Sequence, residues 1–438
     1  MNKTKFKKSL RLFIFILLSS AFVWNCTEDK VKDDVFGSYD PTKPITLDEF
    51  YPDSGGIATK VIIKGTNFGT DPEAVRVWFN KKRASVVKAI GNMLYVITPK
   101  QPGDTNIISV AIGDRKEDSV SFKNFFRYST TTTVTTIAGK AGGGRSVVDG
   151  TLAEAQFDHP RYLCVDAEKN IFVSEYHAHR LRQLNQERNI VTTIHNGNGM
   201  SNPNAPSTDA EGKVIFIPND GGNTMFEFDP EQQWAGKKIT PRQDPESENF
   251  RIDYKHSLAS NTEDGMMYTR AYNGQLIKFN PRTKAAFLVA QNLMNDSDSY
   301  LCFHPDNMDK LYIAYAKKHC VYIFDVKTKE HTLLAGMVNQ KGWADGEATE
   351  AQFSEPRQIC FGDDKCLYIA DSGNHCIRKI SPDGIVSTVV GLPGVKGYRD
   401  GTPEDALFNW PCGVAVDDEG IIYVADYENL CVRKLAIE

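Results

Sequence analysis

A glutamate and two histidines lie close together in residues 175–179, which have the sequence EYHAH. Histidines two residues apart project from one face of a strand and could bind a divalent metal there, whereas in a loop this spacing has no such consequence. If the chain folds into a ring, further acids and histidines could meet Glu175 on the ring axis: Asp220, Asp371, His375 and Asp426. No HExxH or GxSxG motif is present, so a metal-dependent lyase or hydrolase is a hypothesis without a local motif. No cofactor is predicted.

A larger set of aromatic and charged residues suits the binding of sugars. Aromatic rings pack against the C–H faces of sugar rings, and charged groups hydrogen bond to the hydroxyls. The candidates are Arg161, Tyr176, His177, His179, Asp220, Arg270, Tyr272, Tyr315, Lys317, Trp343, Arg357, His375, Tyr398, Trp410 and Tyr427. Two plainer explanations remain open. Asp371 and Asp426 are better explained as caps of turns, and Trp343, Tyr398 and Trp410 could equally pack between structural units.

These candidates are spread over a sequence repeat with a period near fifty residues. Clear copies begin at Gly142, Asn339 and Gly394, and three divergent copies lie between the first two. An aromatic residue marks one strand of every copy, at Phe172, Phe216, Tyr268, Tyr312, Tyr368 and Tyr423. Each complete copy contains four short strands, for example residues 358–362 (strand a), 367–371 (b), 376–380 (c) and 385–391 (d). Six such units predict a six-bladed β-propeller.

The repeat carries a family resemblance. The pattern DG…A.F..P before strand a, followed by YVAD…N…RK across strands b and c, resembles the NHL repeat over about residues 133–438. It is specific in blades 1, 5 and 6 and weak in blades 2 to 4. The resemblance implies that a ligand binds at one face, around the central channel, where the b–c and d–a connections lie. Many NHL propellers bind polypeptides.

The last copy lacks its fourth strand. Residues 134–139 (VTTIAG) match the strand-d sequence VSTVVG of residues 386–391, yet no strands a to c precede them. An uncovered strand c would be an open edge that invites foreign pairing. We therefore expect residues 134–138 to pair with residues 431–437 and to close the ring.

Eight cysteines follow Cys26, and their positions repeat. Cys164, Cys302 and Cys360 share one place in strand a, and Cys320, Cys376 and Cys431 share one place in strand c. Since Ala415 fills the strand-a place in blade 6, we interpret it as a small, buried packing position. Equivalent places on neighbouring blades are too far apart for a disulfide, and no CxxC motif suggests zinc. The sequence predicts free, buried thiols.

Short alternating runs separated by turns occupy residues 45–128 and predict a small β-sandwich. The segments PDSGG (residues 52–56) and VIIKGTNFG (residues 61–69) resemble an IPT/TIG domain, which has an immunoglobulin-like fold. Such a domain implies a spacer or a docking platform. The predicted fold class is therefore all-β: an immunoglobulin-like β-sandwich over residues 45–128 and a six-bladed NHL-type β-propeller over residues 133–438.

Residues 1–25 have the features of a targeting segment. Five basic residues precede an apolar run at residues 12–24 that is too short for an ordinary transmembrane helix. Cys26 follows, so the segment resembles a bacterial lipoprotein signal, although Trp24 and Asn25 replace the usual small residues. The acidic TEDK after Cys26 resembles an export tag for the outer face of the outer membrane. We expect residues 26–44 to be a flexible tether; a plain cleaved secretory signal is the alternative.

Three hypotheses follow for function. The first is a non-catalytic lipoprotein, anchored through Cys26 to the outer membrane and facing the cell exterior, that binds extracellular polysaccharide for a glycan-uptake system. The second is a scaffold that binds a surface protein through the propeller, and the third is the metal-dependent lyase or hydrolase. A formal net charge of −5 and no long basic run after the targeting segment argue against nucleic acid. We expect a monomer or a member of an outer-membrane uptake complex.

Overall fold

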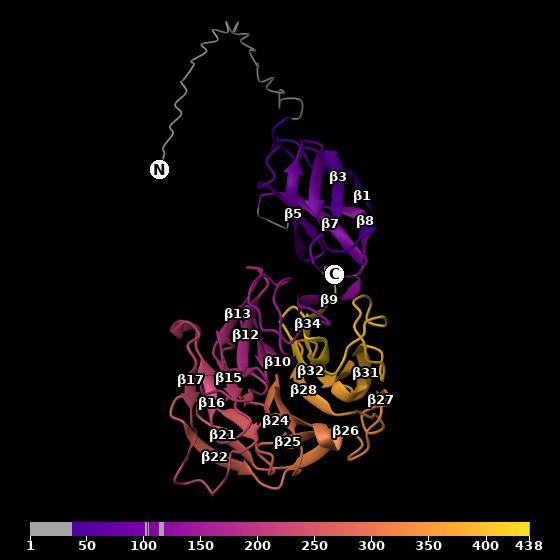
Figure 1. Cartoon of the computed structure of the whole chain (residues 1–438). Coiled ribbons are helices and arrows are strands. Elements are labelled where there is room, and N and C mark those ends of the chain that lie inside the picture. Colours follow the sequence, from indigo (N-terminus) through magenta and orange to yellow (C-terminus); the bar gives the residue numbers. More distant parts are fainter. Residues whose placement is uncertain (1–36, 101–102, 104, 114–117, 438) are drawn as a thin grey trace, which may run out of the picture. The chain divides into compact units, whose positions relative to one another are not determined.

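The computed structural model describes residues 37–100, 103, 105–113 and 118–437. The predicted targeting segment and Cys26 lie outside these residues. The chain divides into two compact units, with the boundary between Ser129 and Thr130 (Figure 1). Within the described residues, no helix has the length and apolar character needed to cross a membrane.

The first unit is an immunoglobulin-like arrangement of strands that forms a near-barrel. Its strands are β1 (Thr46–Tyr51), β2 (Ser54–Gly55), β3 (Lys60–Thr66), β4 (Val75–Phe79), β5 (Lys82–Ala89), β6 (Met93–Ile97), β7 (Thr105–Ile112) and β8 (Val120–Tyr128). They are hydrogen bonded in the order β1-β3-β6-β5-β4-β7-β8-β2. The two sheets of the predicted sandwich are thus joined, because β5 pairs with both β4 and β6.

Alternation of apolar and polar residues explains the core of this unit. In β3, Val61 and Ile63 are fully buried whereas Lys60 and Lys64 are exposed, as expected for a strand with one solvated face. Phe126 of β8 meets Phe79 of β4 edge to face, with ring centroids 5.1 Å apart. These buried side chains belong to one hydrophobic core in the first unit.

The second unit is a six-bladed propeller, in which strands a to d of each blade form one antiparallel sheet. Blades 1 to 3 comprise β10 (Pro160–Val165), β11 (Ile171–Glu175), β12 (Arg180–Asn185) and β13 (Ile190–His195); β14 (Ser207–Thr208), β15 (Ile215–Pro218), β16 (Met225–Phe228) and β17 (Lys237–Ile239); and β19 (Ala259–Ser260), β20 (Met267–Arg270), β21 (Leu276–Phe279) and β22 (Ala285–Ala290). The short β18 (Arg242–Gln243) adds to β22 in parallel. The 3₁₀ turn η3 (Pro230–Gln232) lies between β16 and β17.

Blades 4 to 6 complete the ring. They comprise β23 (Ser299–His304), β24 (Asn307–Tyr315), β25 (Cys320–Asp325) and β26 (His331–Gly336); β28 (Pro356–Phe361), β29 (Leu367–Asp371), β30 (Cys376–Ile380) and β31 (Ile385–Val390), with β27 (Gly346–Glu347) added to β31; and β32 (Pro411–Val416), β33 (Ile422–Asp426), β34 (Cys431–Ile437) and β9 (Thr132–Gly139). In each of these blades a 3₁₀ turn follows strand b: η4 (Ala316–Lys318), η5 (Ser372–Asn374) and η6 (Tyr427–Asn429).

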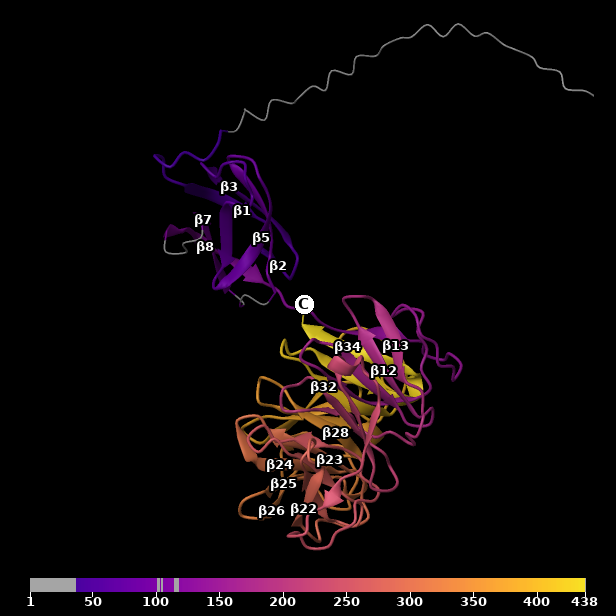
Figure 2. The same cartoon turned by 90° about the vertical axis from the view of Figure 1, so that its left-hand side faces the viewer.

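The six strands a form an inner ring. Each contacts the next around the circle, from β10 through β14, β19, β23, β28 and β32 back to β10. The ring is closed within blade 6, where β9 pairs with β34 in a register that sets Val134 opposite Leu435 and Gly139 opposite Cys431. This is the pairing expected from the sequence, and Figures 1 and 2 show the two ends of the propeller in one blade.

Candidate ligand-binding site

One pocket of about 330 Å³ opens among the b–c and d–a connections of blades 1 to 4. Its lining residues are Arg161, Tyr176, Asp220, Tyr254, His256, Tyr272 and Asp298. Four of the predicted candidates are therefore brought together: Arg161, Tyr176, Asp220 and Tyr272.

Local backbone geometry places the first of these side chains. In blade 1, Pro160 pairs with Glu175 and Tyr162 pairs with Ser174, so the ladder skips Arg161. Such a bulge turns one side chain away from the regular alternation of the strand. Tyr176 is the residue that follows β11 directly. Because the start of strand a pairs with the end of strand b, Tyr176 lies at the same end of the blade as Arg161.

Arg161 stacks on aromatic rings. Its guanidinium carbon lies 4.1 Å from the centroid of the Tyr176 ring and 5.1 Å from that of Tyr162. Tyr176 in turn donates its hydroxyl to Asp220 at 2.8 Å. Burial, together with this bond to a carboxylate, raises the pKa of Tyr176 to about 12, so its hydroxyl remains a donor at neutral pH.

His256 lies between two carboxylates. Its Nε2 is 3.5 Å from Asp220 Oδ1 and 3.4 Å from Asp298 Oδ1. Burial lowers the pKa of His256 against the opposing effect of these two acids. Asp220 also accepts a bond from Asn204 Nδ2 at 2.9 Å. The acids of the pocket are thus held by neighbours that orient them as acceptors.

A buried hydrogen-bonded layer lies next to this pocket, because Tyr162 contacts Arg161 and Tyr300 contacts His256. The Tyr162 and Tyr300 hydroxyls bond to each other, and Arg357 Nη1 donates to both at 3.2 Å. Gln358 adds a bridge from blade 5 to blade 1, because it accepts from the Leu163 amide at 3.1 Å and donates to the Leu163 carbonyl at 2.6 Å. A Cβ at Gly413 would lie 2.9 Å from Gln358 Oε1, so glycine leaves the room for this bridge.

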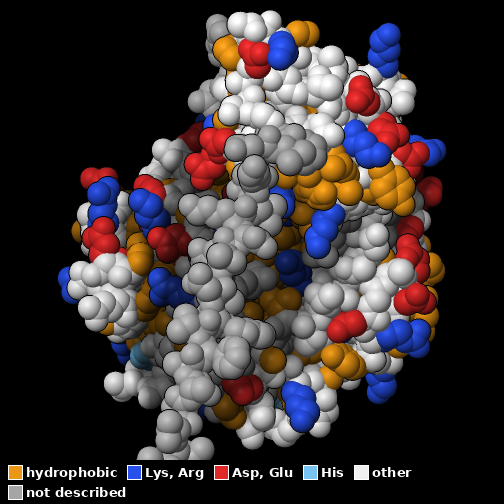
Figure 3. All heavy atoms as spheres, turned by 90° about the horizontal axis from the view of Figure 1, so that it is seen from above, with side chains coloured by type: hydrophobic (Ala, Val, Ile, Leu, Met, Phe, Trp, Pro, Cys, Tyr) orange, Lys and Arg blue, Asp and Glu red, His pale blue; other side chains and the backbone are white. Residues whose placement is uncertain are grey.

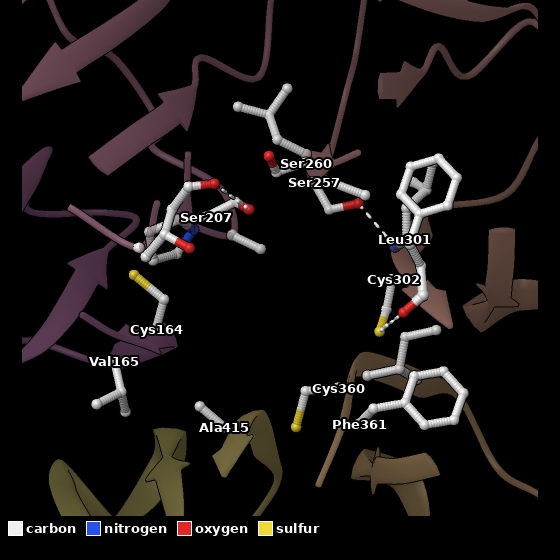
Figure 4. Close-up of a pocket in the computed structure, with 18 of the residues that line it drawn as sticks. Cys164, Val165, Ser207, Ser257, Ser260, Leu301, Cys302, Cys360, Phe361 and Ala415 are labelled. Atoms are coloured by element: carbon white, nitrogen blue, oxygen red, sulfur yellow. Dashed lines mark hydrogen bonds between the residues drawn. The ribbon is translucent and has the colours of Figure 1, made fainter. Parts of the chain in front are cut away.

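A second cavity, of about 750 Å³, lies on the other side of this layer. Figure 4 shows Cys164, Cys302, Cys360 and Ala415 around it, from the strands a of blades 1, 4, 5 and 6. The shared register of these residues was predicted correctly, and Cys164 and Ala415 are buried in hydrophobic clusters as expected, although their side chains also border the cavity. All eight described cysteines are free. Burial raises the pKa of Cys302 to about 12, which keeps this thiol protonated.

Four further candidates lie near this pocket: Lys317 and Arg357 contact its surroundings, and His177 and Tyr427 contact each other. Lys317 Nζ donates to the Tyr272 hydroxyl at 3.0 Å, and Arg357 belongs to the buried layer. His177 Nε2 lies 3.2 Å from the Tyr427 hydroxyl. The Tyr427 ring is 4.8 Å from the ring of His159, so blades 6 and 1 share an aromatic cluster.

Arg270 and Tyr315 do not face the pocket, and their placement there was wrong. Both are completely buried. Arg270 donates to the backbone carbonyls of Leu293 and Ser297, and the Tyr315 hydroxyl lies 3.1 Å from His331 Nε2. A buried guanidinium must find acceptors, and the loop after blade 3 supplies them. These side chains stabilise the interior of the blades.

Three predicted candidates join adjacent blades instead. The Nδ1 atoms of His179 and His375 accept backbone N–H groups of the next blade, from Asn202 at 2.8 Å and Trp410 at 3.0 Å. The His375 and Trp410 rings meet 5.9 Å apart. In blade 4, His319 Nδ1 accepts the Glu355 backbone N–H in the same way. Each of these histidines thus provides a hydrogen-bond acceptor for a backbone N–H of the next blade.

Trp343 and Tyr398 lie beside outer strands. Trp343 Nε1 donates to Thr388 of β31 at 3.2 Å, and the Tyr398 hydroxyl lies 2.9 Å from Thr136 Oγ1 of β9. Both strands are the fourth of their blades, at the opposite edge from the inner ring. Both side chains are exposed, at 50% and 46%, so neither is packed in an interface between blades.

The acids proposed for a channel metal do not converge. Glu175, Asp371 and Asp426 are fully buried and pair with Arg182, Arg378 and Arg433 of strand c, at 3.3, 3.1 and 2.9 Å. Burial raises the pKa of Asp371 and Asp426 to about 6, although the arginines oppose this shift. Among the described residues no group of three or more histidines, cysteines and acids could hold a metal. Asp371 also accepts the Ser354 amide at 2.7 Å, so its role is structural, but its side chain makes no cap hydrogen bond to the turn η5 that follows it.

Sequence analysis missed Tyr254, His256 and Asp298. They precede strand a in blades 3 and 4, where the turn between strands a and b is longer. Cys164 pairs with Phe172, eight residues on, but Cys302 pairs with Tyr312, ten residues on. Counting back from the aromatic residue of strand b therefore misplaces the residues that precede strand a in the divergent blades. Alignment on strand a would have placed His256 level with Arg161.

Charged side chains of both signs are interspersed over the face presented in Figure 3. That face lacks, among its described residues, the continuous basic stripe typical of a nucleic-acid-binding surface.

Comparison with known proteins agrees with this architecture. The IPT/TIG domain model matches residues 45–128, and the NHL repeat model matches residues 408–435. Protein SUPPRESSOR OF QUENCHING 1, chloroplastic, of Arabidopsis thaliana is 26% identical over 303 residues, which are 67% of this chain and 26% of that protein. The chain thus spans about a quarter of the length of this curated relative.

Two solved structures cover both units. A structural genomics protein of unknown function from Bacteroides thetaiotaomicron VPI-5482 is 27% identical with a TM-score of 0.69, and an auxiliary nutrient binding protein from the same organism is 25% identical with a TM-score of 0.62. Each match covers 92% of this chain and 100% of the solved chain. The chain thus contains an IPT/TIG domain at residues 45–128 and a match to the NHL repeat in blade 6 of a six-bladed β-propeller, and its fold is similar to that of an auxiliary nutrient binding protein of Bacteroides.

Proposed function

We propose that the propeller binds a saccharide, without turnover, in the pocket of blades 1 to 4. The observation that carries this proposal is the combination of tyrosine rings with oriented hydrogen-bonding groups in one pocket. Tyr176, Tyr254 and Tyr272 supply ring faces, and Asp220, His256 and Asp298 supply polar atoms. The likeness to a nutrient binding protein of Bacteroides supports a binding role.

The volume limits what can enter. About 330 Å³ is at the lower end of the range for small-molecule pockets, which is about 300–1,000 Å³. Tyr162 and Tyr300, next to the pocket, are fully buried and hydrogen bonded to each other. A chain end or a single branch of a polysaccharide fits this geometry better than the middle of a long chain.

The cellular setting is part of the proposal. A lipid anchor on Cys26 would hold the chain on the outer membrane, facing the exterior, where it would deliver extracellular polysaccharide to an uptake complex. Cys26→Ser should then release the protein from the membrane fraction, and protease added to intact cells should digest the wild-type protein. Protection of the chain in intact cells would contradict surface exposure.

Binding is tested by calorimetric titration of the purified chain with a panel of mono- and oligosaccharides, with chromatography of the mixtures for products. We expect micromolar retention of at least one saccharide and no product. Tyr176→Ala and Tyr272→Ala should each weaken binding about 10-fold or more, because stacked aromatic contacts contribute about 0.5–1.5 kcal/mol beyond the area they bury. Tyr398→Ala, at an outer strand, is the matched control and should bind normally.

Two outcomes would favour the other hypotheses. Release of a shortened saccharide would indicate an enzyme. Absence of saccharide binding, with tight binding of a purified surface protein, would indicate a scaffold.

A further inference from the structure

Arg161 is the one arginine of the pocket wall without an acceptor. Among the described residues, its guanidinium has ring contacts with Tyr176 and Tyr162 and no hydrogen bond or ion pair. Stacking fixes the plane of a guanidinium and leaves its N–H groups free to bind. The side chain is thus positioned before any ligand arrives.

The other buried arginines differ from Arg161. Arg182, Arg378 and Arg433 each bond to two carboxylates, and Arg357 bonds to Glu355 at 3.2 Å. Arg270 is satisfied by backbone carbonyls. A charge that is partly withdrawn from water ordinarily requires such partners, so the missing acceptor at Arg161 needs an explanation.

The acids of the pocket do not supply that acceptor. Asp220 receives Tyr176 and Asn204, and both Asp220 and Asp298 face Nε2 of His256. On the far side of the same imidazole, Nδ1 is buried without a hydrogen-bond partner, and only 7% of His256 is exposed. Arg357 Nε is likewise buried and unpaired. Because Nε2 of the neutral imidazole faces the two acids, Nδ1 is an acceptor, and Arg161 is left as the free cationic donor of the pocket.

We propose that this pocket selects acidic saccharides, with the anionic oxyacid group of the sugar paired to Arg161. The inference rests on the proposed saccharide-binding function and names its ligand class. A guanidinium presents parallel N–H donors that match the two oxygens of a carboxylate. The carboxylate of a uronic acid and the sulfate ester of a sugar share this chemistry, while the tyrosine rings contact the C–H face of the same unit.

The expected effect is a selectivity. A charge-assisted hydrogen bond contributes more than a neutral one, so an acidic sugar should bind about 10- to 100-fold more tightly than its neutral counterpart. The preference should shrink as ionic strength rises, although less than for an exposed pair, because a partly buried pair is screened less.

The test is calorimetric titration of the whole chain with matched pairs: glucuronate and glucose, galacturonate and galactose, the methyl esters of both acids, and the corresponding 6-sulfates. Oligosaccharides that end in each unit form a second set. Preference for the free acids over the esters supports a carboxylate, and preference for the sulfates supports a sulfate ester.

Two variants isolate Arg161. Arg161→Gln should remove the preference for acids, so that each acidic sugar binds no more tightly than its neutral counterpart does to the same variant. Arg161→Lys keeps the charge but loses the paired donors, so it should retain an intermediate preference. Thermal melting without ligand shows whether each variant is folded, and Tyr398→Phe is the control.

The outcomes separate the two proposals. If neutral and acidic sugars bind equally, and Arg161→Gln weakens both alike, the saccharide site stands and the acidic selectivity is wrong. If none of the sugars binds, the proposed function is wrong and the selectivity falls with it. If acids bind more tightly but Arg161→Gln keeps the preference, the assignment to Arg161 is overturned.

Discussion

Arg433 Nη1 donates to Asp426 Oδ2 at 2.9 Å, and neither side chain is exposed. Nη2 of the same guanidinium reaches Asp400 at 2.6 Å and the Arg399 carbonyl at 2.7 Å. Arginine and acids at the same places pair in blades 1 and 5. The recurring Arg of strand c therefore binds strand b and the connection before strand a into one blade.

Loss of this arginine should destabilise the propeller strongly. Arg433→Met would leave Asp426 buried without a cation, and breaking a buried pair from one side costs about 3–5 kcal/mol. Denaturant unfolding of the variant measures the loss. Lys434→Met, one residue on and partly exposed, is the control and should cost less than about 1 kcal/mol. Equal stability of the two variants would contradict a structural role for the arginine.

Ring closure is tested by two glycines of blade 6. Gly139 has φ +92°, and a Cβ there would lie 2.5 Å from the Leu430 carbonyl oxygen and 2.7 Å from Cys431 Cα. Gly420 has φ +77° but open space around it. Both alanine variants incur the strain of a positive φ, about 1–2 kcal/mol, but only Gly139→Ala also forces β9 from β34.

We expect Gly139→Ala to lower the free energy of unfolding by about 1–3 kcal/mol more than Gly420→Ala does. Thermal and denaturant unfolding of both variants give the comparison. If the two alanines cost the same, the contact between β9 and β34 does not limit the stability of the ring.

The sequence predicted the frame of the propeller better than its pocket. Period, strand order and closure follow from local signals such as the match of residues 134–139 to residues 386–391. Arg161 and Tyr176 were found because blade 1 keeps the repeat pattern. His256 was not, since the longer a–b turns of the divergent blades shift the count. Arg270 shows a further limit: residue type suggested a ligand contact, but burial against backbone carbonyls decided its role.

Acidification should weaken the fold through His331. This side chain packs on Tyr322, with ring centroids 4.4 Å apart, and bonds to Tyr315. Burial, reinforced by Arg270, lowers the pKa of His331 to about 4. The unfolded chain takes up the proton near pH 6.5 and the folded chain does so only near pH 4, so stability falls as the pH drops between these values.

By pH 5 the protonation of His331 in the unfolded chain should lower the free energy of unfolding by up to about 2 kcal/mol relative to pH 7. Denaturant unfolding of the wild-type chain and of His331→Gln at pH 7 and pH 5 isolates this loss of stability. The other titratable groups are the same in the two proteins and should contribute equally. The wild type should lose more stability than the variant does. An identical pH dependence in the two proteins would show that His331 is not responsible.

Thiol reactivity should distinguish the two cysteine layers. Cys302 and Cys360 border the 750 Å³ cavity and are partly accessible, whereas Cys376 and Cys431 are fully buried. Burial raises the pKa of all four. Because the thiolate is the reactive form, the native protein should react slowly at pH 8 with any thiol reagent.

We expect iodoacetamide to modify Cys302 and Cys360 first and to reach Cys376 and Cys431 only on unfolding, which peptide mass spectrometry over a time course resolves. Global unfolding should expose all of them at once. Cys302→Ala and Cys360→Ala should each remove one early site, with little loss of stability, because the deleted atoms border open volume. Early labelling of Cys376 in the native protein would mean that strand c opens locally, against the pairing of β29 and β30.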